Sequence, residues 1–180
     1  MDYFNLSQQI RKAIEENSEI LQLVEHTYSE EHEPFASGGT AHLYRVGRLP
    51  NGIHVALRSF GLYPDLAVRD FEDQILEMEH YCRNAERLFE KGEPVPKFCV
   101  GIVCGDNAGI LTEDLTANGT CRLEHNPARP FGFIIDEKGS RKKVFIDVDG
   151  EFSKYDSDLS RRFFREKHRI QLINPGNIYK

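Results

Sequence analysis

The chain has 180 residues, of which 39% are hydrophobic and 29% are charged, as in an ordinary globular protein. This length favours a single domain with room for two unequal lobes. The net charge of −6 argues against non-specific binding to nucleic acid or to an anionic membrane, and no apolar run approaches the roughly 18 residues of a membrane helix. We therefore expect neither nucleic acid nor a membrane as a partner.

Few residues are spaced as metal ligands usually are. None of the four cysteines forms a C-x-x-C pair, so no zinc motif is predicted. His26 and His32 lie among glutamates, and for this stretch a solvated acidic loop is favoured over a metal site. Because no signal peptide is evident, we expect reduced thiols in a cytoplasmic protein, with delivery into a host cell as the alternative.

Hydrophobic periodicity predicts an α+β chain. Apolar residues at helical spacing predict two N-terminal helices separated by the cap-type residue Asn17, and Asn51-Gly52 predicts a hairpin turn. The elements expected after these helices are strands at 35–46 and 53–60, a helix at 64–90, strands at 97–103 and 108–115, a loop at 116–130, a hairpin of 131–136 with 143–148, a short helix at 158–168 and an extended tail at 170–180. They divide the chain into a helical extension at 1–33, a lobe at 34–115 and a reduced C-terminal part at 116–180.

A run of small residues interrupts the first expected strand. Its members are Ser37, Gly38, Gly39 and Thr40. Glycines let the backbone approach a ligand closely and leave N–H groups free to face phosphate oxygens. A kink or bulge in the strand explains the same residues without a ligand.

The second expected strand carries one cation. Side chains alternate along a strand, so Val55 and Leu57 should face one way while Ala56 and Arg58 face the other. A cation on a ligand-facing side would pair with phosphate oxygens, whereas the simpler alternative is an exposed strand arginine.

Two carboxylates lie at the end of the last expected strand. Asp147 and Asp149 are two residues apart and precede Gly150. Because Mg²⁺ binds one or two carboxylates together with substrate phosphates, this pair is a candidate metal and catalytic site. An acidic turn is the alternative.

Taken together, these features resemble the protein-kinase-like fold, whose N-terminal lobe combines a glycine-rich loop, a V-A-I-K strand, a helix glutamate and a hinge. Residues 37–44 resemble the glycine-rich loop, with Gly38 as its central glycine. Val55-Ala56-Leu57-Arg58 resembles V-A-I-K with arginine in the lysine position. Residues 110–115 resemble the fifth strand and hinge, with Thr112 as the gatekeeper.

The resemblance implies an antiparallel sheet with one long helix, and a site for ATP and Mg²⁺. Gln74 stands near the position of the helix glutamate, and Glu77 is the nearby substitute. The hinge backbone at Glu113 and Leu115 would bind an adenine edge. Residues 147–150 stand at the position of D-F-G, which assigns metal binding to Asp147.

The match weakens beyond the hinge. If His125 begins the catalytic loop, Pro127 replaces the base aspartate and Gly132 the metal-binding asparagine. His125 and Asp136 are the remaining candidates for a base. Arginine keeps the charge of the family lysine but not its geometry, which phosphoryl transfer requires.

Three hypotheses follow from these patterns. The favoured one is a degenerate, pseudokinase-like module that acts by binding or regulating a protein partner, with nucleotide binding weak or absent. The second is an atypical minimal kinase that uses Arg58, Asp147 and Asp149 on Mg²⁺–ATP to phosphorylate a protein or small molecule. The third is a plain α+β domain whose Gly-Gly hairpin is coincidental.

Overall fold

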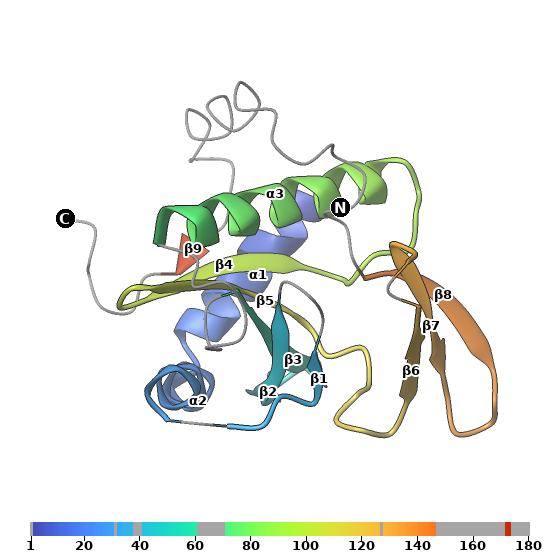
Figure 1. Cartoon of the computed structure of the whole chain (residues 1–180), viewed down its shortest axis with the longest axis horizontal. Coiled ribbons are helices and arrows are strands. Elements are labelled where there is room, and N and C mark those ends of the chain that lie inside the picture. The colour runs from blue at the N-terminus through green and yellow to red at the C-terminus, as the bar shows by residue number, and fades with distance from the viewer. Residues whose placement is uncertain are drawn as a thin grey trace.

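Three helices and two sheets make up the α+β fold in the residues that the structure describes (Figure 1). The structure is a computed structural model, and it describes residues 2–30, 32–37, 41–60, 71–126, 128–146 and 172–173. The elements are α1 (Tyr3–Glu15), α2 (Ser18–Ser29), β1 (Ala36–Ser37), β2 (His42–Arg48), β3 (His54–Ser59), α3 (Phe71–Glu90), β4 (Cys99–Cys104), β5 (Asn107–Glu113), β6 (Arg122–His125), β7 (Phe131–Ile135), β8 (Arg141–Phe145) and β9 (Leu172–Ile173).

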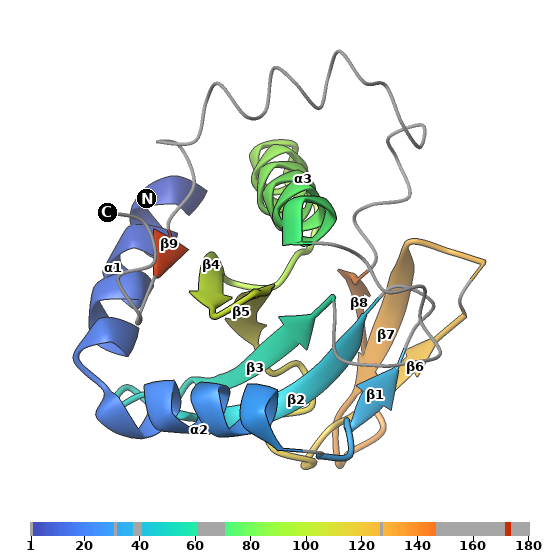
Figure 2. The ribbon, with the colours of Figure 1, turned by 60° about the vertical axis from the view of Figure 1, so that its left-hand side comes forward.

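Helix α3 covers one face of the larger sheet and α2 covers the other, while α1 packs along β4 and also contacts α3 through Tyr3 (Figure 2). Its strand order is β1-β2-β3-β5-β4-β9, and every pair but the last is antiparallel. One core lies between α3 and the sheet, and the other lies between the sheet and helices α1 and α2. The smaller sheet, β6-β7-β8, is antiparallel throughout.

Several local expectations are confirmed. Asn17 caps α2, because its side-chain oxygen accepts a hydrogen bond from the backbone N–H of Ile20 at 3.2 Å. The turn at Asn51-Gly52 joins β2 to β3, with Gly52 at a φ of 90°. Val55 and Leu57 belong to the core under α1 and α2, whereas the side chain of Arg58 lies over the Tyr81 ring of α3.

One expectation for the second half of the chain is wrong. Residues 116–130 were expected to be a loop, but β6 lies within them and pairs with β7 in the register Arg122↔Ile135. The strand is exposed along most of its length, so it has no alternating apolar pattern to reveal it. The tail was expected to be extended, and its described residues form the strand β9, in which Leu172 pairs in parallel with Gly101 of β4.

Some predicted features lie outside the described residues. These are Gly38, Gly39, Thr40, Asp147, Asp149 and the expected helix at 158–168. Among the described helices, none combines the length and the apolarity that crossing a bilayer requires.

The four cysteines form no disulfide. Cys82 of α3 and Cys99 of β4 are nevertheless neighbours, with their sulfur atoms 2.7 Å apart in the core. They are 17 positions apart in the sequence, so no short motif marks the pair.

Gly109 lets the centre of the sheet approach α2. A Cβ atom there would lie 2.5 Å from the Tyr28 hydroxyl and 2.7 Å from the backbone oxygen of Arg58. Because the Arg58 oxygen belongs to the paired strand and cannot swing away, Gly109→Ala should lower the free energy of unfolding by about 3 kcal/mol, measured by urea denaturation.

The matched control is Gly101→Ala on the neighbouring strand. There the closest atom to a new Cβ is the sulfur of Met78 at 2.7 Å, at the flexible end of a side chain. We expect a loss of about 1 kcal/mol for this variant. Equal stability of both variants and the wild type would contradict the pairing of β3 with β5.

Candidate functional site

A narrow cleft lies where the larger sheet faces β6 and the end of β8. Its lining comes from Leu43 of β2, Ala56 and Arg58 of β3, Thr112 and Glu113 of β5, Leu123 of β6, and Ile146 after β8. The enclosed volume is about 20 Å³, which is room for little more than a water molecule. A ligand the size of a nucleotide would therefore enter only after side chains move apart.

Arg58 is the buried cation in the lining of this cleft. The residue is 8% exposed, and its guanidinium lies 4.8 Å from the centre of the Tyr81 ring. One terminal nitrogen donates a long hydrogen bond of 3.4 Å to the backbone oxygen of Ile146, and Nε has no hydrogen-bond partner. No carboxylate of the described residues forms an ion pair with Arg58, so within that part of the chain this buried cation has no anion.

Tyr81 occupies the side of α3 that faces Arg58. Sequence reasoning favoured Gln74 or Glu77 for this place. The Gln74 side chain instead accepts a hydrogen bond from the N–H of Ala108 at 2.9 Å, and Glu77 is half-buried and does not line the cleft. Tyr81 follows Glu77 by four residues, so both lie on the same face of α3. The helical repeat in the sequence could therefore have indicated Tyr81 as a neighbour of Arg58.

The turn after β5 is built around the buried carboxylate of Asp114. Its oxygens accept hydrogen bonds from the backbone N–H groups of Thr116 at 2.9 Å and Asn118 at 3.0 Å. Arg45 of β2 adds an ion pair at 3.3 Å. These contacts hold Leu115 at the mouth of the cleft.

The two predicted hinge residues offer different groups to the cleft. Both line it, but the Glu113 carboxylate is engaged by Lys97, whose Nζ lies 3.1 Å away. The backbone of Leu115 makes no hydrogen bond with any described residue. The free backbone of Leu115, rather than the Glu113 side chain, is therefore available to a ligand.

At the glycine-rich end, only the flanking residues are described. The backbone of Ser37 pairs with His42 of β2. Burial lowers the pKa of His42, so its imidazole is neutral at pH 7 and adds no positive charge. Arg58 is consequently the cation that the described lining brings to the cleft.

Neither remaining candidate for a base lies in the cleft. The exposed His125 has its Nε2 atom 2.9 Å from the backbone oxygen of Arg129. Asp136 is also exposed and accepts hydrogen bonds from the N–H groups of Lys138 and Ser140, which close the turn between β7 and β8. Both therefore have local structural roles.

Comparison of the chain with known protein families, curated proteins and solved structures finds no match. The kinase-like relationship therefore stays a prediction. A proposal for function has to be based on the side chains that line the cleft.

Replacing Asp114 should destabilise the protein strongly. In Asp114→Ala, two turn N–H groups and the Arg45 guanidinium lose a buried acceptor, for which we expect a loss of about 2–4 kcal/mol in unfolding free energy. Asp106→Ala, in an exposed turn, is the matched control and should change stability by about 0.5 kcal/mol or less. Similar urea midpoints for the two variants would contradict the claim that Asp114 stabilises the turn.

Proposed function

We propose that this chain is a kinase-like binding module whose cleft takes an adenine nucleotide weakly, and which acts by contacts with a protein partner rather than by catalysis. The observation that carries the proposal is the buried guanidinium of Arg58, which lacks an anion among the described residues. A phosphate group would supply the missing charge and accept the unused N–H.

The lining around Arg58 suits a flat, mostly apolar ring. Leu43, Ala56 and Leu123 provide apolar walls from both sheets. The unpaired backbone of Leu115 lies at the edge, where it can hydrogen-bond a purine. An apolar slot with one polar edge and one deep cation is the arrangement that a nucleotide requires.

Three features favour binding over phosphoryl transfer. The cleft is closed, so part of the binding energy is spent on opening it. Arg58 faces the ring of Tyr81, whereas a kinase positions its lysine with a helix glutamate. Neither His125 nor Asp136, the candidate bases, lies near the cleft.

A minimal kinase is the second candidate, and one observation favours it. Ile146 lines the cleft, and its backbone oxygen accepts the hydrogen bond from Arg58. The next residue in the sequence is Asp147, the carboxylate expected to bind Mg²⁺. This reading requires the acidic pair to hold a metal beside the phosphates.

Nucleotide binding should depend on Arg58. At a Mg²⁺–ATP concentration about 100 times Kd, the wild type should gain about 2.7 kcal/mol, or roughly 5–10 °C in Tm. Arg58→Met should abolish this shift because it removes the cation while keeping most of the volume. Without nucleotide its Tm should be unchanged or higher, since an uncompensated buried charge is gone.

The control is Arg11→Met on α1, an arginine on the far side of the sheet. It should retain the full nucleotide shift. No shift of the wild type at saturating nucleotide, or an equal shift in Arg58→Met, would overturn the proposed site.

Catalysis is tested separately by transfer of the labelled γ-phosphate to the chain itself or to a general protein acceptor. We expect the wild type to transfer no more phosphate than Asp147→Asn. The minimal kinase would instead be established by three results together. The wild type would transfer phosphate, Asp147→Asn would reduce the transfer roughly 100-fold, and Asp106→Asn would leave it unchanged.

A further inference from the structure

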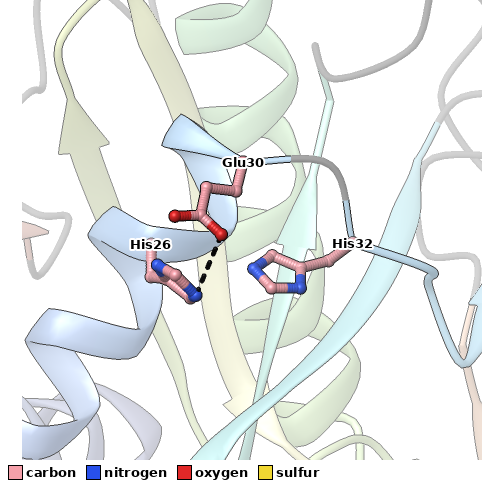
Figure 3. Close-up of side chains that lie close together, drawn as sticks. All are labelled: His26, Glu30 and His32. Carbon is pink, nitrogen blue, oxygen red and sulfur yellow. Dashed lines mark ion pairs between the residues drawn. The ribbon is translucent and has the colours of Figure 1, made fainter.

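A second group of polar side chains lies where α2 ends and the chain turns toward β1. His26 is in the last turn of α2, and Glu30 is its C-cap. Residues four apart share one face of a helix, and His32 reaches the same place from the following segment. Figure 3 shows the three side chains pointing toward one another, and one donor atom from each lies within 4.8 Å of the others.

The spacing of these donor atoms approaches that of a tetrahedral metal site. Zinc bonds to imidazole nitrogen or carboxylate oxygen are ~2.1 Å long, which places tetrahedral neighbours ~3.4 Å apart. His26 Nε2 and Glu30 Oε2 are already 3.3 Å apart (Figure 3). His32 is the ligand that must move inward, by on the order of 1 Å.

His32 also carries an unused donor atom. Its Nε2 is buried and has no hydrogen-bond partner, although an unsatisfied buried polar atom usually costs about 1–3 kcal/mol. The two histidine rings are tilted neighbours, 4.8 Å apart between centres. A metal ion between these side chains would bind the unpaired Nε2 of His32 and the Glu30 carboxylate that already faces His26.

We propose that His26, Glu30 and His32 form a Zn²⁺ site. Two imidazoles and a carboxylate suit zinc, whereas Mg²⁺ and Ca²⁺ prefer oxygen ligands alone. A hollow of about 230 Å³, lined by both histidines and Glu33, adjoins the three ligands and has room for the water molecule that would complete the coordination. The sequence places both histidines among glutamates, but only the structure shows that the side chains of His26, Glu30 and His32 converge.

The metal would fix the segment that leads from α2 to β1. Phe35 in that segment lies under the guanidinium of Arg45, at 4.2 Å from its ring centre, and also lines the cleft. Zinc binding would therefore restrain one wall of the cleft from a distance. The proposed site does not depend on nucleotide binding.

The test uses the whole chain, freed of metal and titrated with Zn²⁺ against a chromophoric chelator. One equivalent should bind, and at about 100 times Kd the Tm should rise by roughly 5–10 °C. Losing a residue that only hydrogen-bonds to a metal ligand typically weakens metal binding ~10–100-fold. Because His32→Ala and Glu30→Gln each remove a direct ligand, both should weaken zinc binding by more than this. Mg²⁺ should not compete.

His125→Ala is the matched control, because it removes an exposed histidine from the other sheet and should leave zinc affinity unchanged. Cobalt distinguishes these ligands from the cysteines, since Co²⁺ bound by nitrogen and oxygen absorbs in the visible without a sulfur charge-transfer band. Absence of saturable binding, a sulfur band, or equal affinity in His32→Ala and the wild type would each overturn the site.

Discussion

Strand β3 is the constraint on which the cleft depends. It is hydrogen-bonded to β2 on one side and to β5 on the other, and it is buried on both faces. Its register places Leu57 in the core under α1 and α2 and Arg58 on the opposite face. A slip of one residue would exchange the two and bury a guanidinium among apolar side chains, so the pairing strongly specifies where the charge lies.

Arg45 plays a complementary role at the outer edge of the cleft. Its guanidinium covers the ring of Phe35, pairs with Asp114 and donates a hydrogen bond to Thr116 at 2.9 Å. One side chain on β2 thus connects the segment before β1 with the turn after β5. Arg58 also faces an aromatic ring and donates one long hydrogen bond, but it forms no ion pair with a described residue and its Nε is unused. This contrast distinguishes the structural Arg45 from an arginine available to a ligand.

The cleft and the proposed zinc site meet at the segment between α2 and β1. His32 lies within this segment and Phe35 follows three residues later, on the wall of the cleft. Ordering one end of so short a segment restricts the other, because few backbone torsions lie between them. A metal ion and a nucleotide would therefore favour related conformations of the same stretch.

Local patterns in the sequence determined the helices at the N-terminus, the cap at Asn17, the Asn51-Gly52 turn and the alternation that turns Arg58 away from Leu57. Each depends on residues within one helical turn or one strand, where backbone geometry and burial leave a direct periodic trace. Only the tertiary structure decided that Tyr81 faces Arg58, that β6 and β9 exist as strands, and that His32 joins His26 and Glu30. The strand pairings and the contact of Tyr81 with Arg58 arise between separate segments, and the place of His32 depends on how the chain turns after α2. None of these contacts leaves a repeat in the sequence from which it could be predicted.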